Sequence, residues 1–126
     1  MEERIISRRN PPGSDSPYSR AVVYGGLVFV SGQVSLDPDT GAFRPGAFAE
    51  EAERSLRNLR AALEDAGSSM EKVLKTTVFL ADMRDFPTFN EIYRRHFPKD
   101  RPARSCIAAK ELPFGAKVEI EAVAAV

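Results

Sequence analysis

The sequence predicts an α+β fold in which one sheet carries two helices on one of its faces. Two observations support this prediction. Two segments repeat apolar residues every three or four positions, as amphipathic helices do, and six shorter segments are rich in β-branched residues. Their order is β-β-β-α-β-α-β-β, and 126 residues suffice for a single domain, residues 1–126, around one core.

The N-terminal part of this pattern consists of three predicted strands. A short strand at residues 4–6 precedes a loop over residues 8–17, which is rich in proline and serine. The β-rich runs 21–24 and 27–30 are joined by two glycines, the pair that a tight hairpin turn favours. A second turn is expected at residues 37–41, because Asp-Pro-Asp-Thr-Gly consists of common turn residues.

Two segments have the periodicity of amphipathic helices. The first spans residues 48–66 and is followed by Gly67, a typical C-terminal cap. Its apolar stripe consists of Phe48, Ala52, Leu56, Leu59, Leu63 and Ala66. The second is predicted to begin after Asp85 as its N-cap, with Pro87 in the first turn, and to end before Pro98. Its stripe consists of Phe86, Phe89, Asn90, Tyr93 and Phe97.

Three further strands are predicted at residues 73–80, 103–109 and 117–125, and they leave one sheet face without a partner. Alternation places Leu74, Thr76, Val78 and Leu80 on one face of the first of these strands. Both faces of the sheet are partly apolar, but two helices can cover only one of them. We expect another copy of the chain to cover the second face, which predicts a homo-oligomer with sites near subunit boundaries.

The composition excludes several classes of function. Lys plus Arg equals Asp plus Glu at 18 each, so the chain lacks the basic excess of a nonspecific nucleic-acid binder. Cys106 and His96 are the only residues of their types, which rules out an intrachain disulfide and a cysteine-based metal cluster, and we expect no cofactor. With no signal peptide and no membrane-spanning run of ~20 apolar residues, the expected compartment is the cytoplasm.

Arg104 is the strongest candidate for a functional residue. It lies in a predicted strand of small and apolar residues, and strand alternation places Cys106 on the same side. A guanidinium in such surroundings needs an anion, and its planar fork suits a carboxylate. Two possibilities remain open: an internal ion pair with Glu119 or Glu121, or the binding of an anionic ligand.

The remaining titratable candidates are Glu119, Cys106 and His96. Because Val123 and Ala125 share the strand face of Glu119, we expect this face to become covered, which would perturb the carboxylate and suit it to carry a proton or orient water. Cys106 has no histidine placed to activate it as a nucleophile, so we interpret it as a residue that lines the site. His96 is interpreted as a surface residue.

Further positions have both a functional and a structural interpretation. Tyr18 lies in a predicted loop, where it either closes over a ligand or packs within the loop. Ser31 and Gly32 end a strand, where either the backbone closely approaches another group or the chain leaves the sheet. Asn90 interrupts an apolar stripe, which predicts a buried polar partner that is either structural or functional.

Together these residues resemble the signature of the RidA/YjgF family. The C-terminal part of the resemblance consists of Pro102-Ala103-Arg104-Ser105-Cys106, Leu112-Pro113 and Val118-Glu119-Ile120-Glu121-Ala122. Supporting motifs are Ser16-Pro17-Tyr18-Ser19, Ser31-Gly32-Gln33, Asp37-Pro38 with Thr40-Gly41, Lys75-Thr76-Thr77-Val78-Phe79-Leu80, and Asp85-Phe86 with Asn90 and Tyr93. The match runs from about Asn10 to the C-terminus, with departures at Ser16 and Arg20, where many members have Gly and Gln in the cleft loop.

The resemblance implies a chorismate-mutase-like fold with a mixed sheet, assembled as a homotrimer with clefts between subunits. It implies hydrolysis of reactive 2-imino or enamine acids to 2-keto acids and ammonia without a metal, the activity of a 2-iminobutanoate/2-iminopropanoate deaminase. Arg104 would hold the substrate carboxylate, and Glu119 would orient or activate water. The residues implied to line the cleft are Tyr18, Ser31, Gly32, Asn90, Arg104 and Cys106.

Two other functions stay open at this point. One is a regulatory protein that binds small carboxylates without turnover. The other is an endoribonuclease or translation inhibitor, an activity that has been attached to members of this family. Neutral charge and a single histidine weigh against ribonuclease chemistry, because RNA binding needs a cationic surface.

Overall fold

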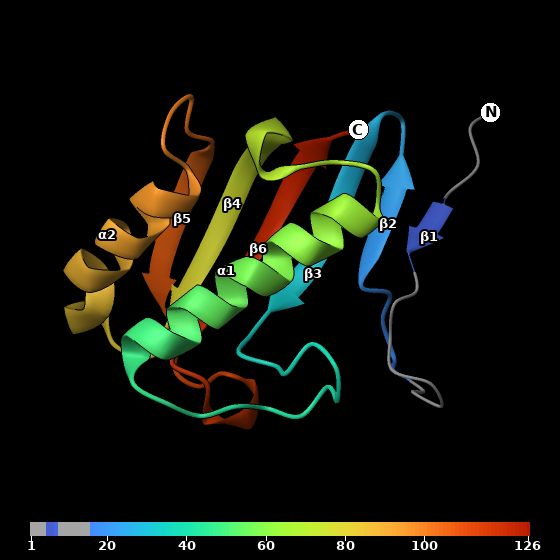
Figure 1. Cartoon of the computed structure of the whole chain (residues 1–126). Coiled ribbons are helices and arrows are strands. Elements are labelled where there is room, and N and C mark those ends of the chain that lie inside the picture. The colour runs from blue at the N-terminus through green and yellow to red at the C-terminus, as the bar shows by residue number, and fades with distance from the viewer. Residues whose placement is uncertain (1–4, 8–15) are drawn as a thin grey trace.

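Six strands form one sheet in the order β1-β2-β3-β6-β4-β5, and two helices pack against it (Figure 1). The computed structural model describes residues 5–7 and 16–126. The strands are β1 (Ile5–Ser7), β2 (Ala21–Tyr24), β3 (Leu27–Gln33), β4 (Val73–Leu80), β5 (Ala103–Ala108) and β6 (Val118–Ala125). The helices are α1 (Phe48–Asp65) and α2 (Phe86–His96), with short 3-10 turns η1 (Met70–Lys72), η2 (Met83–Asp85) and η3 (Pro113–Gly115).

The predicted α+β class and order of elements are confirmed. Each predicted strand and helix is present, and its ends differ by at most three residues from those expected. Gly25 and Gly26 form the hairpin turn with φ angles of 60° and 77°, which favour glycine. Residues 1–4 and 8–15 lie outside the described part of the chain. They include the first residue of the predicted N-terminal strand, Asn10, and most of the predicted loop.

Strand β6 lies between β3 and β4 and runs antiparallel to both, whereas β4 and β5 run parallel, so the sheet is mixed. The register places side chains in rows across β6, β4 and β5. One face carries the row Ala122, Thr76 and Arg104, and the opposite face carries the row Glu119, Phe79 and Ile107. We call the first of these the helix face and the second the open face.

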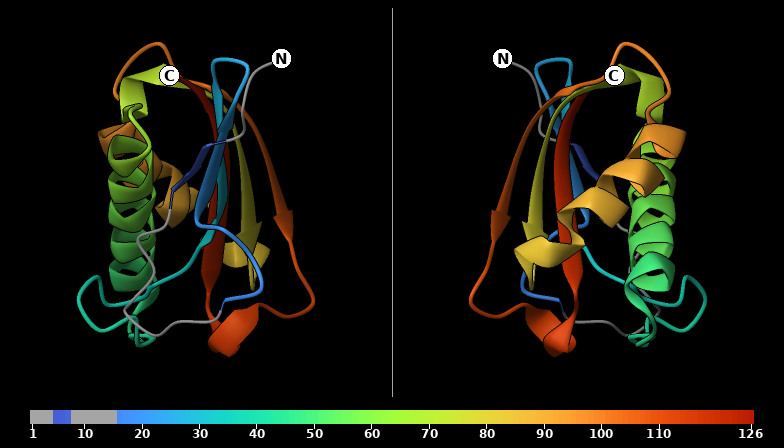
Figure 2. Two further views of the ribbon diagram at one scale, coloured as in Figure 1. Left: turned by 90° about the vertical axis from the view of Figure 1, so that its right-hand side faces the viewer. Right: turned by 90° about the vertical axis from the view of Figure 1, so that its left-hand side faces the viewer.

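Both helices lie over the helix face, and no helix of residues 16–126 lies over the open face (Figure 2). The helix face is dense, since Ile120, Val78 and the α1 residue Leu56 are all 0% exposed. On the open face, by contrast, Phe29 remains 45% exposed and Ile107 51% exposed. The uncovered second face that the strand patterns predicted is therefore present.

Helix α1 follows the predicted stripe and ends where expected. Its buried residues include Ala52, Leu56, Leu59 and Leu63. Gly67 has a φ of 87°, and the backbone N–H of Ser68 donates to the carbonyl of Leu63 at 2.8 Å, which closes the last turn. No helix of residues 5–7 and 16–126 is long and apolar enough to cross a lipid bilayer.

Helix α1 also carries three buried polar residues that the sequence did not single out, Glu51, Ser55 and Asn58. The Glu51 carboxylate, 1% exposed, accepts hydrogen bonds from the backbone N–H of Lys117 at 3.0 Å and from Lys117 Nζ at 3.2 Å. Asn58 Nδ2 donates to the carbonyls of Val34 and Leu36 at 3.0 and 2.9 Å. These bonds hold the segments after β3 and before β6 against the helix, at the end of the sheet where Glu119 lies.

The second helix begins after Asp85 as predicted, but the expectation for His96 is wrong. Asp85 occupies the N-cap position, although its side chain makes no capping hydrogen bond. Instead, Asp82 caps the preceding 3-10 turn by accepting from the backbone N–H of Arg84 at 2.9 Å. His96 is not a free surface residue: its side chain is 12% exposed, and Nε2 lies 3.1 Å from Glu53 Oε2, because α2 packs against α1 at this point.

The predicted alternation along β4 is also wrong at one residue. Pairing with β6 shifts between Val73 and Lys75, so Leu74 is an extra residue in a β-bulge. Val73 is consequently 5% exposed, whereas Leu74 is 50% exposed and has left the buried set. The remainder of that set, Thr76, Val78 and Leu80, is buried as expected.

Candidate functional site

Arg104 is held on the helix face by two aromatic rings of α2. Strand β5 pairs in parallel with β4, which places Arg104 opposite Thr76 and directs its side chain towards the helices. The guanidinium carbon lies 4.8 Å from the ring centre of Tyr93 and 5.4 Å from that of Phe86. Cation–π contacts of this kind orient a guanidinium without using its N–H donors.

The predicted alternative of an internal ion pair for Arg104 is contradicted. Glu119 and Glu121 project from β6 onto the open face, whereas Arg104 lies on the helix face, so the sheet itself separates them. Within residues 16–126, Arg104 makes no ion pair or side-chain hydrogen bond. Its donors are therefore available to an anion from outside the described chain.

Two side chains close to Arg104, Tyr93 and Cys106, have raised pKa values. Tyr93 Oη and Thr76 Oγ1 share a hydrogen bond of 2.7 Å in the core. Burial raises the pKa of Tyr93, against the lowering effects of the Thr76 hydrogen bond and the Arg104 charge. Burial likewise raises the pKa of the Cys106 thiol, which the Arg104 charge only partly offsets. A thiol kept protonated is a poor nucleophile, which supports the interpretation of Cys106 as a lining residue.

Asn90 does not have the buried polar partner that its place in the stripe predicted. Its Oδ1 is buried and accepts no hydrogen bond. Asn90 lies one helical turn after Phe86 and one before Tyr93, so it shares the helix surface that carries the two rings under Arg104. A buried amide oxygen without a donor is costly, and a ligand N–H at this place would satisfy it.

Glu119 is the second reactive group, and it lies on the open face. Burial raises the pKa of this carboxyl group, and the neighbouring charge of Glu121 raises it further. The perturbation predicted from its strand neighbours is thus present. A carboxyl group with a raised pKa exchanges protons more readily near neutral pH than an ordinary glutamate does.

The end of β3 lies against Glu119 and anchors the loop that carries Tyr18. Ser31 Oγ donates to the carbonyl of Ser19 at 2.6 Å, and the Ser31 backbone N–H donates to the carbonyl of Arg20 at 2.9 Å. Tyr18 itself is 58% exposed, so packing within the loop does not account for it. The Arg20 side chain turns away to α1, where it lies 3.0 Å from the Asp65 carboxylate.

Within one chain, the predicted site residues form two groups rather than one site. Arg104, Cys106 and Asn90 lie on the helix-face side of β5. Glu119 and Gly32 lie together at the end of the sheet, on the open side. Ser31 joins the second group to the Tyr18 loop.

Comparison with known proteins identifies the family. Residues 8–126 match the family model described as Endoribonuclease L-PSP. The chain belongs to the RidA/YjgF family. This confirms the resemblance inferred from the Arg104 and Glu119 motifs.

Relatives of this RidA/YjgF chain include proteins with a named activity and with solved structures. The human 2-iminobutanoate/2-iminopropanoate deaminase is 45% identical over 121 residues, which covers 96% of this chain and 88% of the human protein. A crystal structure titled putative endoribonuclease L-PSP from Entamoeba histolytica superposes with a TM-score of 0.91 at 42% identity, over 98% of this chain and 100% of that one. E. coli TdcF with bound serine gives a TM-score of 0.86 at 39% identity, over 97% and 98% of the two chains.

Two site residues of this RidA/YjgF chain were missed as functional. Phe86 and Tyr93 were placed in the apolar stripe of a helix and in a family motif but were given no role in the site, whereas they hold the Arg104 guanidinium. Their spacing of seven residues placed them on one helix surface, yet nothing in the sequence showed that β5 would face that surface. In the described residues, no group of three or more His, Cys, Asp or Glu side chains is arranged to hold a metal ion.

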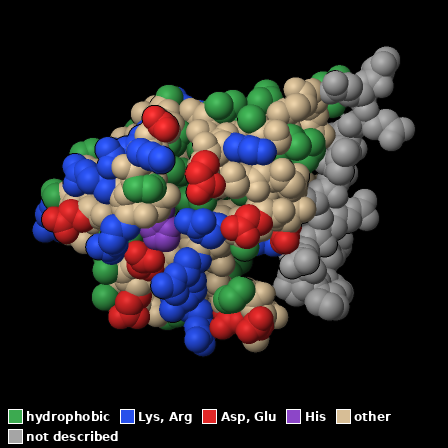
Figure 3. Space-filling view, turned by 45° about the horizontal axis from the view of Figure 1, so that its top comes forward, with side chains coloured by type: hydrophobic (Ala, Val, Ile, Leu, Met, Phe, Trp, Pro, Cys, Tyr) green, Lys and Arg blue, Asp and Glu red, His purple; other side chains and the backbone are tan. Residues whose placement is uncertain are grey.

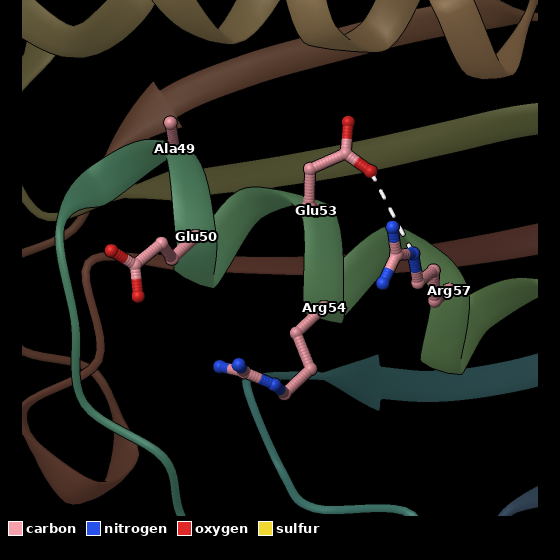
Figure 4. A pocket seen from close by; sticks show the side chains of 5 residues that line it. All are labelled: Ala49, Glu50, Glu53, Arg54 and Arg57. Carbon is pink, nitrogen blue, oxygen red and sulfur yellow. Dashed lines mark ion pairs between the residues drawn. The ribbon is translucent and has the colours of Figure 1, made fainter.

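A separate hollow of about 310 Å³ lies on the outer side of α1 and contains none of these residues (Figure 4). It is lined by Ala49, Glu50, Glu53, Arg54 and Arg57. Glu53 and Arg57 form an ion pair at 3.8 Å within it. Figure 3 shows positive and negative side chains interspersed over this part of the surface, as on an ordinary solvated face.

Proposed function

We propose that this protein hydrolyses reactive 2-imino and enamine acids to 2-keto acids and ammonia, in clefts between the subunits of a homotrimer with a chorismate-mutase-like fold. The observation that carries the proposal is Arg104, whose guanidinium is oriented by two rings and has no anionic partner in residues 16–126. The name of the human relative supports the activity, and the serine bound by TdcF supports a small ligand with a carboxylate.

Arg104 is assigned to the substrate carboxylate in this proposal. A guanidinium fork binds a carboxylate through two parallel hydrogen bonds, which fixes the position of the neighbouring 2-carbon. We assign the Asn90 Oδ1, which has no donor in the described chain, to accept a hydrogen bond from the imine nitrogen. The substrate would thus be held at two points on the helix-face side of β5.

Glu119 is assigned to the water. An iminium carbon is already electrophilic, so the reaction needs only a placed water and a route for protons. Water adds to the carbon with loss of a proton to the carboxylate, and the resulting amino alcohol expels ammonia as its hydroxyl group becomes the keto oxygen. The raised pKa of Glu119 helps it both to take up and to return this proton.

The proposal needs more than one copy of the chain. Arg104 and Glu119 project from opposite faces of one sheet, so a single chain does not bring them to the same substrate. The open face is partly apolar and carries Glu119 near one end. Another copy seated on this face would cover the exposed side chains and bring its own Arg104 towards Glu119.

The test couples an amino-acid deaminase that releases 2-imino acids to detection of keto acids. We expect faster keto-acid release with this protein, and loss of at least about 100-fold of that acceleration in Arg104→Ala, since a charge-assisted clamp is removed. Arg94→Ala, an exposed arginine on α2, is the matched control and should behave as wild type. If Arg104→Ala accelerates release as wild type does, the deaminase proposal is wrong. If the wild type binds the keto acid but does not speed its formation from the imino acid, the deaminase proposal is replaced by a binding role without turnover.

A further inference from the structure

Gly32 lies directly beneath the Glu119 carboxylate. A Cβ atom built on Gly32 would lie 2.1 Å from Glu119 Oε2, 2.7 Å from Cδ and 3.0 Å from Cγ. Favourable contacts between such atoms occur at about 3.5–4.0 Å, so no side chain fits at position 32 while Glu119 keeps its position. The three nearest atoms all belong to Glu119, so this side chain occupies the space closest to Gly32.

The backbone at this point does not itself require glycine. Five glycines of the described residues have a positive φ, and Gly32 is not one of them. An alanine could therefore adopt the same backbone conformation. What position 32 provides is the absence of a side chain rather than conformational freedom.

A β-bulge brings Gly32 to this place. Val30 pairs with Ala122 and Gln33 with Ile120, so Ser31 and Gly32 together oppose the single residue Glu121 of β6. Bulges re-aim side chains and often lie beside active sites. Here the bulge places a bare stretch of β3 backbone against the side chain of Glu119.

We propose that Gly32 is a positioning residue for Glu119: its missing side chain leaves the space in which the carboxylate rests against β3, ready for the water of the deamination. This inference rests on the proposed deaminase function. Any side chain at position 32 displaces the carboxylate, because the flexible end of Glu119 yields more easily than the strand backbone. The chain still folds, but the group that orients water is moved.

The test is Gly32→Ala, with Gly46→Ala as the matched control. A Cβ on Gly46 would also meet a glutamate oxygen, Glu50 Oε2 at 2.9 Å, and Gly46 likewise has no positive φ. Glu50 has no role in the proposed reaction. We expect kcat to fall by about 10- to 100-fold in Gly32→Ala, as a displaced catalytic group does, and to be unchanged in Gly46→Ala.

A second measurement does not depend on activity. Carboxyl ¹³C NMR titration follows Glu119 directly, with Glu119→Gln assigning its signal. In the wild type the pKa of Glu119 is raised by burial and by Glu121. In Gly32→Ala we expect it to fall back towards the value of an ordinary glutamate, because the displaced carboxyl group becomes hydrated. An unchanged titration together with an unchanged kcat would overturn the inference and leave the deaminase proposal standing.

Shortening the displaced side chain tests the steric cause. In Gly32→Ala with Glu119→Asp, the side chain is shorter by one bond, which draws the carboxylate back and lessens the clash with the new methyl group. The double variant should therefore be more active than the product of the two single effects predicts. If the loss of activity in the double variant equals the product of the losses in the two single variants, the inference is contradicted. Should Gly32→Ala alone fail to fold, the clash predicts that Gly32→Ala with Glu119→Ala folds, and failure of that pair would also overturn it. If the wild type lacks deaminase activity, the proposed function fails, while the NMR titration still decides the position of Glu119.

Discussion

The two faces of the sheet differ in what one chain provides. On the helix face, Ile120 and Val78 are fully buried, and Arg104 is fixed over Tyr93 and Phe86. On the open face, Phe29 and Ile107 remain about half exposed, although their side chains are as apolar as those of the core. The helix face is complete within the chain, whereas the open face lacks a cover. The chain therefore builds the anion-binding group of the proposed site by itself, and the proposed assembly would complete the Glu119 side.

The largest expected effect is on stability, and it is tested by truncating one isoleucine on each face of the sheet. Ile120→Ala should lower the free energy of unfolding by about 2–5 kcal/mol, because it leaves a cavity in the helix-face core. Ile107→Ala should cost about 1 kcal/mol or less at low protein concentration. Denaturant unfolding at a low and a high protein concentration checks this pair of variants. If another copy covers the open face, the loss of unfolding free energy in Ile107→Ala rises with protein concentration, whereas the loss in Ile120→Ala does not. Equal costs at low concentration would contradict the difference between the faces.

The next expected effect is on assembly. Phe29→Lys places a charge on the open face, where burial against another copy would require its desolvation. We expect sedimentation to show a trimer for the wild type and mainly monomer for Phe29→Lys, with circular dichroism unchanged. Deaminase activity should be lost with the trimer. A wild type that sediments as a monomer at micromolar concentration, or a Phe29→Lys trimer, would rule out this face as the interface.

A smaller effect is expected in the pH dependence of stability. The folded-state pKa of Glu119 is raised by burial and by Glu121, so the folded chain holds this proton more tightly than the unfolded chain. Its contribution to stability is present below the unfolded pKa and is lost as the pH rises through the folded pKa. Glu119→Gln should therefore gain stability relative to the wild type as the pH rises from the unfolded pKa through the raised folded pKa, while it loses activity. If the unfolding free energies of the wild type and of Glu119→Gln change with pH in the same way, the raised pKa of Glu119 is contradicted.

The smallest effect is expected where α1 meets α2. Burial opposes ionisation of Glu53, but His96, Arg95 and Arg57 outweigh it, so the pKa of Glu53 is lowered. Its contribution is present above the unfolded pKa and is lost as the pH falls through the folded pKa. Glu53→Gln should cost about 0.5 kcal/mol or less at neutral pH, and the difference should vanish in acid. Thermal unfolding at neutral and at acid pH checks this prediction, with Glu64→Gln, at an exposed position on α1, as the control. If Glu53→Gln still lowers stability in acid, the loss comes from packing and not from the charge.

Most of the local structure could be predicted because it depends on neighbours in sequence. The stripe of α1, the Gly25-Gly26 hairpin and the Gly67 cap each follow from periodicity or from the backbone freedom of glycine. The errors arose where distant segments decide. Leu74 leaves the core because β6 pairs with β4 through a bulge, and His96 is covered because Glu53 comes from another helix.

The candidate site divides in the same way. Arg104 and Glu119 were identified from their residue types, their strand neighbours and the family motifs around them. Whether Arg104 pairs with Glu119 or binds an external anion was open in the sequence. The sheet register excluded the pair with Glu119, since residues on opposite faces of a sheet do not meet, and the binding of an anion remains a proposal. The rings beneath Arg104 and the glycine beneath Glu119 likewise became visible only as contacts between separate elements.

The sequence by itself thus determined the elements, their order, the family and the residue types that can do chemistry. These follow from short-range propensities and motifs, which are properties of adjacent residues. The tertiary structure alone decided which face each group occupies, which polar atoms lack partners and where the absence of a side chain matters. Those depend on strand register and helix packing, in which a shift of one residue moves a side chain to the other face.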